Sequence, residues 1–287
     1  MNLFHYCSNS AFVSIISTRE IWASEFSLSN DLLEGKWIRE IFKEYCIEKG
    51  VHDFEQSTLV GDLANAATVI GGAGFCMSEE GDLLSQWRGY ADDGAGVSIG
   101  FSKEYFEALG KLKMNRNDSF NAVITQVVYD VAKQKEIISE HGEEIIRLVS
   151  EGGLRVPGLL TTETGDEKRQ RQAKRRQIAL EFFLLFPHFY SLKNPAFAEE
   201  REWRLISHVF RGAGENPLSD LMKMDFRPRA DRIVPFRRVA LDEVGIAPIT
   251  EVVLGPRNVT PEEIVDAMLK KYSMTAVRVR RSSASYR

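Results

Sequence analysis

Residues 83–101 read LLSQWRGYADDGAGVSIGF and combine three kinds of local structure. The first part, Leu83–Tyr90, has the character of a short helix or an irregular segment. Asp92–Gly96 is rich in the residues that form turns. Val97–Phe101 then alternates between apolar and small residues, which predicts a β-strand. This stretch therefore favours a fold in which helices and strands are mixed.

The same mixture continues on both sides, without the regular alternation of a parallel βαβ fold. Apolar and β-branched runs predict strands at 3–6, 20–24, 75–78, 121–129, 202–207, 233–236, 249–254 and 276–279. Helical spacing predicts several shorter helices and two long ones, at 133–150 and 166–186. The glycines of residues 71–74 are expected to interrupt the helix before them. We predict a single α+β domain over residues 1–287, with a compact mixed or antiparallel sheet core and a long helical insertion at about 130–190.

The composition is that of an ordinary globular protein. Of the 287 residues, 44% are hydrophobic and 27% are charged. The formal net charge is -4, so no overall positive field attracts nucleic acid. Cys7, Cys46 and Cys76 lie far apart and form no C-x-x-C pair, which argues against a disulfide framework and a zinc site. We expect reduced thiols and no metal.

Neither a signal peptide nor a membrane span is expected. The residues after Met1 lack the basic and apolar regions of a signal peptide. No apolar run approaches the roughly 20 residues that cross a bilayer. The most apolar stretch, residues 178–190, is shorter and is interrupted by Glu181 and Pro187. We expect a cytoplasmic protein without a membrane partner.

Two segments of the first half carry residue types suited to ligand binding. In His5-Tyr6, one ring nitrogen of the histidine can bond a hydroxyl group, although a structural histidine is the commoner case. In the second segment, Arg88 can form paired bonds with a carboxylate or phosphate. Trp87 and Tyr90 can stack on a ring. The alternative is a structural knot, with Trp87 in the core and Arg88 paired to an acidic residue.

The third segment is Glu200-Arg201-Glu202, at the start of a predicted strand. On a strand, Glu200 and Glu202 point to the same face and Arg201 to the other. Two neighbouring carboxylates suit acid–base chemistry, because each raises the pKa of the other. A solvated, charged edge strand is an equally good interpretation.

A basic run from Lys168 to Arg176 occupies the first half of the second long helix. Such a run can contact phosphates. A solvated helix face is the commoner case for such a run, and no aromatic residues interleave it to stack on bases.

These segments belong to motif blocks that resemble the bacterial domain-of-unknown-function family 2971. That family has an H-Y-[TC]-S start, an N-D pair, an S-x-x-x-D-x-x-x-x-W-x-x-Y-[AG] block, a K-x-P-x-[FW]-x-x-E-x-E-[WY]-R block and a terminal S-x-x-x-Y-R. The matching residues are His5 to Ser8, Asn30-Asp31, Ser78, Asp82, Trp87, Tyr90, Ala91, Lys193, Pro195, Phe197, Glu200, Glu202, Trp203, Arg204 and Tyr286-Arg287. The blocks together span most of the chain, but the name of the family implies no function.

A second, weaker resemblance is to the ADP-ribosyltransferase fold. Enzymes of that fold carry a His or Arg on the first strand, a Ser or Tyr on a middle strand and a Glu, often within E-x-E, on a later one. The order His5, Ser78, Glu202 is similar. No S-T-S element is present, and Ser78 and Glu202 are far apart in the sequence.

This resemblance implies roles for individual residues and NAD as the substrate. His5 would hold the ribose next to nicotinamide, and Tyr6 or Trp87 would stack near the nicotinamide ring. Glu202 would stabilise the oxocarbenium-like charge, and Glu200 would orient the acceptor. Ser78, Arg88 and Tyr90 complete the predicted NAD site, with no metal.

Three functions therefore remain open. The first is an ADP-ribosyltransferase-like enzyme or NAD hydrolase, with a protein or nucleic acid as a macromolecular acceptor, in the manner of a bacterial toxin or phage-defence effector. The second is a protein that binds or processes nucleic acid without NAD, suggested by Arg88 and the run Lys168 to Arg176. The third is a non-enzymatic antitoxin or adaptor. The oligomeric state does not follow from the sequence.

Overall fold

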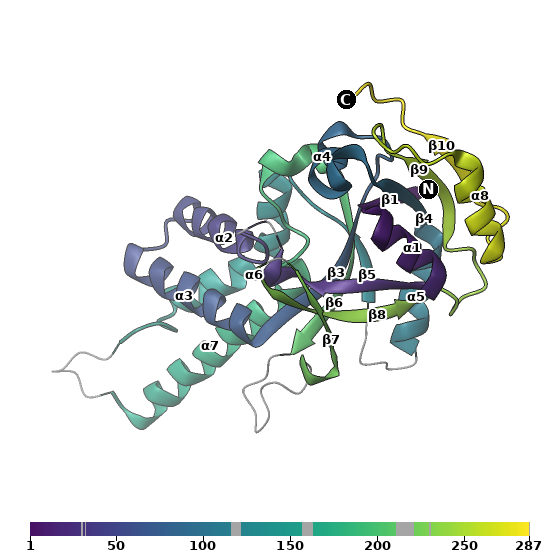
Figure 1. Cartoon of the computed structure of the whole chain (residues 1–287). Coiled ribbons are helices and arrows are strands. Elements are labelled where there is room, and N and C mark those ends of the chain that lie inside the picture. Colours follow the sequence, from purple (N-terminus) through teal and green to yellow (C-terminus); the bar gives the residue numbers. More distant parts are fainter. Residues whose placement is uncertain are drawn as a thin grey trace.

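Figure 1 shows the computed structural model of the chain, which combines an open sheet with helices. The structure describes residues 1–29, 31, 33–115, 122–156, 163–210, 221–229 and 231–286. Asn30, Arg287 and residue 121, which the sequence motifs and strands above include, lie outside the described residues. Within the described residues, no helix is both long and apolar enough to cross a membrane.

The core is one open, mostly antiparallel sheet, as the α+β prediction requires. Its main path has the strand order β10-β9-β4-β1-β3-β2-β8-β7, and β6 pairs with both β3 and β5 beside that path. β9 and β10 pair in parallel, and the other described pairs are antiparallel. The strands are β1 (Asn2–Cys7), β2 (Glu20–Glu25), β3 (Ile70–Ser78), β4 (Val97–Ser102), β5 (Ala122–Gln126), β6 (Glu202–Phe210), β7 (Asp225–Pro228), β8 (Ile233–Ala240), β9 (Ile249–Leu254) and β10 (Arg278–Arg281).

The sheet forks at β3. One edge of β3 pairs with β6 along its whole length, from Ile70 to Ser78. On the other edge, β2 pairs at Ala73 and Gly74, whereas β1 pairs at Ser78. Phe75–Met77 therefore lie where β1 and β2 diverge. The two arms of the sheet leave a gap at this point, and the gap positions the candidate site described below.

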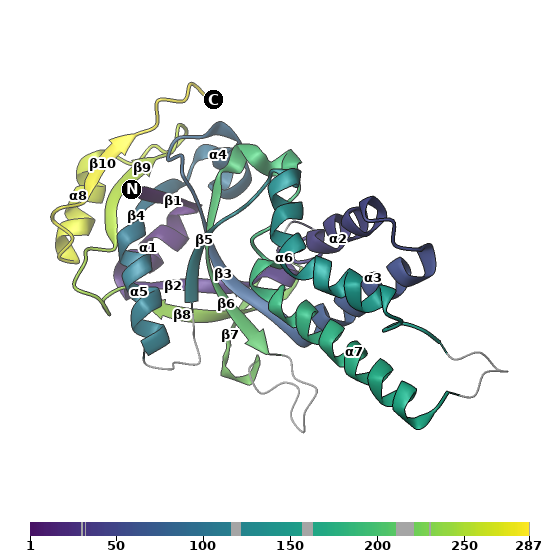
Figure 2. The same cartoon turned by 180° about the vertical axis from the view of Figure 1, so that it is seen from behind.

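Helices cover both faces of the sheet (Figures 1 and 2). α1, α5 and α8 share one hydrophobic core with strands of both arms, including Phe12, Tyr105 and Val265. α4 lies on the other face of β1, where Trp87 packs against Phe4 and Tyr6. The helices are α1 (Asn9–Thr18), α2 (Trp37–Glu48), α3 (Asp53–Val69), α4 (Leu84–Tyr90), α5 (Lys103–Asn115), α6 (Val131–Ser150), α7 (Gly165–Leu184) and α8 (Glu262–Lys271).

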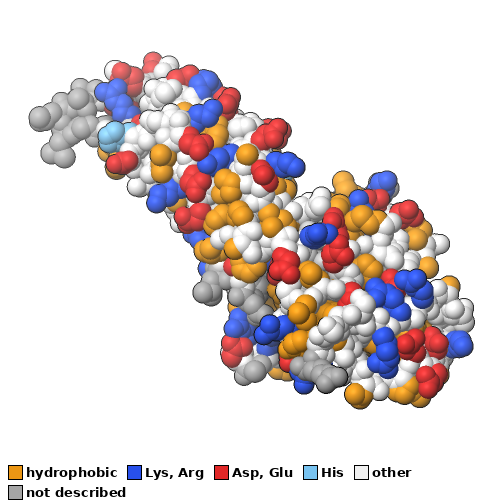
Figure 3. Space-filling model, turned by 90° about the horizontal axis from the view of Figure 1, so that it is seen from above, with side chains coloured by type: hydrophobic (Ala, Val, Ile, Leu, Met, Phe, Trp, Pro, Cys, Tyr) orange, Lys and Arg blue, Asp and Glu red, His pale blue; other side chains and the backbone are white. Residues whose placement is uncertain are grey.

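α2, α3, α6 and α7 form a helical lobe beside the sheet (Figures 1 and 2). The two long helices predicted from the sequence are α6 and α7, and the lobe adds α2 and α3 to them. Its hydrophobic core reaches the sheet at Ile206 of β6, with Cys76 of β3 packed against it. In Figure 3, acidic and basic side chains alternate over the surface of the lobe, so neither sign of charge dominates that face.

The glycines of residues 71–74 lie within β3, directly after α3, so they do more than interrupt a helix. A Cβ atom on Gly72 would collide with the ring of Tyr190, and one on Gly74 with the ring of Phe26. These two rings stack on each other with centroids 5.0 Å apart. The helix ends at Val69 as predicted, but the strand begins at Ile70 rather than at Phe75, and the missing side chains of these glycines make room for aromatic rings.

Candidate functional site

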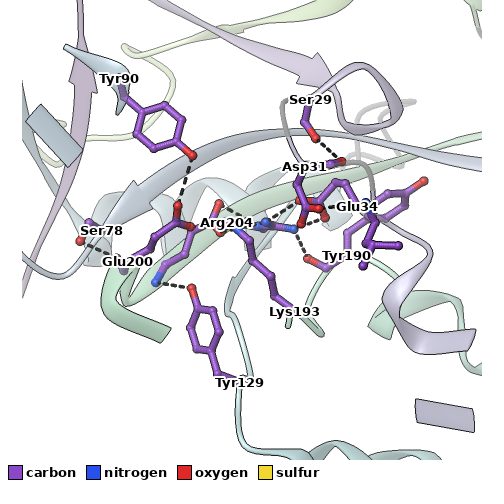
Figure 4. Close-up of polar contacts among 12 residues, drawn as sticks. Ser29, Asp31, Glu34, Ser78, Tyr90, Tyr129, Tyr190, Lys193, Glu200 and Arg204 are labelled. Carbon is purple, nitrogen blue, oxygen red and sulfur yellow. Dashed lines mark hydrogen bonds and ion pairs between the residues drawn. The ribbon is translucent and has the colours of Figure 1, made fainter. Parts of the chain in front are cut away.

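A pocket of about 130 Å³ lies at the fork of the sheet. Strands β1, β3 and β6, helix α4 and the segment after β2 all contribute to its lining. Four aromatic side chains, Phe4, Tyr6, Phe26 and Tyr90, form its walls. The remaining lining is largely charged, and these charged groups contact one another (Figure 4).

Arg204 of β6 is the centre of a buried ion network. Its guanidinium donates two hydrogen bonds to Glu34, at 2.6 and 2.8 Å, and two to Glu202, at 2.9 and 2.8 Å. It also donates to the backbone carbonyl of Tyr190 at 2.8 Å. Only 1% of the Arg204 side chain is exposed. Paired Arg–carboxylate bonds of this kind fix both distance and orientation, so Glu34 and Glu202 are held rigidly.

Lys193 supplies the second cation of this network. Its ammonium nitrogen lies 2.5 Å from Glu200 and 3.1 Å from Glu202. The Tyr90 hydroxyl donates to the other oxygen of Glu200 at 3.2 Å. The backbone N–H of Glu202 donates to the Tyr129 hydroxyl at 3.2 Å. Glu200 and Glu202 thus meet at one lysine, beside the pocket that both of them line.

The two cations determine the ionisation of Glu202. Burial alone raises the pKa of its carboxyl, but Arg204 and Lys193 outweigh burial and lower the pKa to about 2. At Glu34 the balance is reversed, because burial outweighs Arg204 and raises the pKa. The expectation that the E-x-E pair raises the pKa of both members is therefore wrong for Glu202. Opposite charges in direct contact outweigh the neighbouring carboxylate.

The E-x-E pair is not arranged as a strand. Residues Pro195–Glu200 form a 3₁₀ helix, and Asn194 caps its start by accepting from the backbone N–H of Ala196. Arg201 has φ 44° and ψ 52°, a left-handed conformation that ends this helix. β6 then begins at Glu202. The two carboxylates converge through this sharp turn rather than through the alternation of a strand, which corrects the geometry predicted above.

His5 lies at the fork and lines the same pocket as Glu202. Its Nδ1 is 2.8 Å from the carbonyl oxygen of Cys76, and its ring stacks on Phe75 with centroids 4.1 Å apart. Because a carbonyl only accepts, Nδ1 carries the proton and Nε2 is left as an acceptor. Burial lowers the pKa of His5 to about 4, with a further small contribution from Arg227. The ring is therefore neutral at pH 7.

Three residues predicted for the site do not line the pocket. Trp87 is fully buried, and its Nε1 donates to Asp82 at 2.8 Å, so its ring is not a stacking surface. The Ser78 hydroxyl donates to the backbone carbonyl of Glu200 at 2.7 Å. The Arg88 guanidinium lies over the ring of Tyr286, 5.9 Å from its centroid. Ser78 thus braces the turn that carries Glu200.

The two predicted tyrosines do line the pocket. The Tyr6 hydroxyl donates to the backbone carbonyl of Glu80 at 2.7 Å and accepts from the N–H of Leu83 at 2.9 Å. Its ring is therefore fixed by bonds at its far end. Tyr90 is 45% exposed and contacts Glu200, which places it at the mouth of the pocket.

Sequence reasoning did not assign roles to Lys193, Arg204 and Glu34, which complete the network. Lys193 and Arg204 stand in the same motif block as Glu200 and Glu202, and that block was the available signal. Glu34 belongs to no motif, and its contact with Arg204 joins residues that are distant in the chain. No group of three or more His, Cys, Asp or Glu side chains in the described residues is arranged to hold a metal ion.

The basic run of α7 is largely paired with acidic side chains of the same chain. Arg171 contacts Glu163 at 2.8 Å, and Arg175 contacts Asp62 at 2.8 Å. Lys174 lies 3.3 Å from Glu151. These pairs reduce the positive field that a nucleic acid would meet.

The comparisons with known proteins show a resemblance to one family and point to no activity. Residues 86–205 match the family model described as "Protein of unknown function (DUF2971)". This match confirms the resemblance indicated by the motif blocks. It includes Trp87, Tyr90 and the block from Lys193 to Arg204, while His5 and Ser78 precede it. No curated protein and no solved structure matches the chain.

Proposed function

We propose that this protein is an enzyme that cleaves the bond between nicotinamide and ribose in NAD, as an ADP-ribosyltransferase-like enzyme or an NAD hydrolase. The observation that carries the proposal is that His5, Glu200 and Glu202 line one pocket with aromatic walls. The order of these residues on β1 and at the start of β6, with β3 between the two strands, supports an ADP-ribosyltransferase-like fold.

The size and the aromatic walls of the pocket favour binding of the nicotinamide end of the dinucleotide. A pocket of about 130 Å³ is close to the ~150 Å³ cavity that holds benzene, so it suits a single ring. Aromatic side chains attract a positively charged ring through their π faces. Nicotinamide in NAD is such a ring, and Phe4, Tyr6, Phe26 and Tyr90 are available to contact it. The adenosine end would lie outside.

The charges of the site suit the reaction. When the glycosidic bond breaks, nicotinamide leaves with the bonding electrons and the ribose carries a positive charge. Glu202 is ionised at pH 7, and Glu34, Glu200 and Glu202 stand against two cations, Arg204 and Lys193. A carboxylate fixed in this way stabilises a developing positive charge without reorganisation.

The remaining roles follow from hydrogen-bonding capacity. Neutral His5 offers Nε2 as an acceptor for a ribose hydroxyl. Glu200 lies beside Tyr90 at the mouth of the pocket, where it can accept the proton of the attacking water or acceptor hydroxyl. A macromolecular acceptor, protein or nucleic acid, would approach from that side.

The test is NAD consumption by the purified chain, followed as release of nicotinamide. Glu202→Gln removes the charge and keeps the shape, and it is expected to lower the rate about 100-fold or more. Glu199→Gln is the matched control, because Glu199 stands in the same acidic run but bonds Ser85 instead of lining the pocket. It should retain activity.

Two results would count against this function. One is wild-type protein that neither binds nor consumes NAD at about 1 mM, the upper end of ordinary KM values. The other is an equal loss of activity in Glu202→Gln and Glu199→Gln, because the loss would then give Glu202 no specific role in the reaction. Salt-dependent binding of nucleic acid that is lost when Lys168 to Arg176 are neutralised would instead favour the nucleic-acid alternative.

A further inference from the structure

We propose that Lys193 is a positioning residue, whose ammonium group holds the carboxylates of Glu200 and Glu202 side by side at the pocket. The contacts on which this rests do not depend on the substrate. Its consequence for catalysis rests on the function proposed above.

The ammonium group of Lys193 occupies a defined place between the two carboxylates. It lies 2.5 Å from Glu200 and 3.1 Å from Glu202, and 6% of its side chain is exposed. The ring of Phe197 lies on another side of it, with the centroid 4.7 Å from the nitrogen. A buried ammonium group in contact with two carboxylates and a ring face has little freedom to leave.

The backbone of Lys193 is fixed by the helical lobe. Gln134 of α6 is fully buried, and its amide nitrogen donates to the carbonyls of Val128 at 2.6 Å and Lys193 at 2.8 Å. The oxygen of the same amide accepts from the indole of Trp37 in α2 at 3.0 Å. The backbone N–H of Lys193 donates in turn to the carbonyl of Val128 at 3.2 Å. The lobe thus determines where the lysine, and through it the E-x-E pair, is placed.

The charges around the pair explain why the lysine is needed. Arg204 bonds Glu34 and Glu202, and Lys193 joins Glu200 to the network. Among the described residues, the other titratable side chains facing this point come from β1, β3, α4 and the segments after β2 and β5, and they carry no positive charge at pH 7. They are His5, Asp31, Cys76, Tyr90 and Tyr129. Without Lys193, Glu200 and Glu202 repel each other and Glu202 loses one of its two cations.

Removal of the Lys193 charge should change proton binding by Glu202, an effect that loss of packing alone would not cause. Glu202 has a pKa of about 2 because of Arg204 and Lys193. Removal of one charge in direct contact typically moves a carboxyl pKa by about one unit or more. In a variant without the charge, Glu202 should therefore take up its proton at a higher pH.

The experiment compares Lys193→Gln and Lys193→Arg in the full chain. Lys193→Gln keeps a hydrogen-bond donor and removes the charge, whereas Lys193→Arg keeps the charge. The readout is a carbon-13 NMR titration of the Glu202 carboxyl, assigned with Glu202→Gln. We expect the midpoint to rise by about one pH unit or more in Lys193→Gln and to stay near the wild-type value in Lys193→Arg.

Lys135→Met provides a matched control, because Lys135 also bridges two glutamates, Glu44 at 3.1 Å and Glu48 at 2.6 Å, on the lobe. It should leave the Glu202 titration unchanged. If Lys193→Gln does not fold, the titration of the Glu202 carboxyl in the wild-type protein tests the proposal instead. A Glu202 carboxyl that protonates at or above the ordinary glutamate range there, or an unshifted midpoint in Lys193→Gln, overturns the proposal.

The same Lys193 variants distinguish failure of this proposal from failure of the proposed NAD reaction. If wild-type protein consumes NAD, the acid side of its pH–rate profile should move up in Lys193→Gln and return in Lys193→Arg. If the wild type consumes no NAD, the proposed reaction fails, while the NMR titration still tests the role of Lys193.

Discussion

Basic side chains bridge pairs of glutamates in two regions of the protein, at the pocket and on the helical lobe. At the pocket, Arg204 bridges Glu34 and Glu202 with 1% of its side chain exposed. On the lobe, Arg147 bridges Glu144 and Glu151 with 52% exposed. The contacts are alike, but the surroundings differ. Water can replace the partners of Arg147, whereas the side chains of Glu34 and Glu202 are only 5% and 8% exposed.

This difference separates charges that position groups from charges that keep a surface solvated. An exposed ion pair gains little, because water already stabilises both ions and holding long side chains together costs entropy. A buried network is held by the penalty for leaving any member unpaired. In this protein the buried network lies at the candidate site, where both candidate carboxylates take part in it.

Removal of the buried arginine should have the largest effect on stability. Arg204→Met leaves Glu34 and Glu202 without their shared cation inside the protein. We expect a loss of about 3–5 kcal/mol in the free energy of unfolding, measured by urea denaturation. Arg147→Met, the control on the lobe, should change the unfolding curve little because its glutamates face water. Equal losses in the two variants would mean that burial does not decide the strength of these contacts.

Protonation of His5, in the same pocket, should make stability depend on pH. Burial lowers the pKa of His5 to about 4, so the unfolded chain binds more protons than the folded one between about pH 4 and 6.5. Stability from this residue is complete above that window and falls as the pH decreases through it. Burial also lowers the pKa of His188 and His208, which act in the same direction.

His5→Gln should therefore reduce the loss of folding stability at acidic pH. We expect a reduction of about 1–3 kcal/mol between pH 6.5 and 4, without abolition of the loss. The free energy of unfolding at several pH values, in wild type and variant, measures the effect. An unchanged slope in His5→Gln would show that the ring is accessible to protons in the folded protein.

The sequence predicted local structure well where one period dominated. The alternation of Val97–Phe101 and the amphipathic pattern of 133–150 correspond to β4 and α6. The helix ends before the glycines as predicted, but the strand already includes them, and the Tyr190 and Phe26 rings that need their space come from distant segments. The fork of the sheet is likewise a property of pairing between strands, and no single strand sequence contains it.

The candidate site was predicted in part. His5, Glu200 and Glu202 stand in motif blocks, and all three line the pocket. The sequence did not reveal the ionisation of Glu202, because that depends on how near Arg204 and Lys193 lie in the fold. Composition alone left the role of Trp87 open, and the structure gives it a buried contact with Asp82.

Salt should have a small effect, and it should act on the exposed ion pairs of Arg147 more than on the buried network of Arg204. At about 1 M salt the screening length falls to roughly 3 Å, so charge interactions that water reaches are largely lost. Any small difference between Arg147→Met and wild type should then disappear. The deficit of Arg204→Met should persist, because ions do not enter a network whose arginine is 1% exposed. Urea denaturation of the three proteins at low and high salt measures both. If high salt also removed the Arg204→Met deficit, the network would have to be open to solvent, and the Glu202 carboxylate would lack the fixed setting on which its proposed role depends.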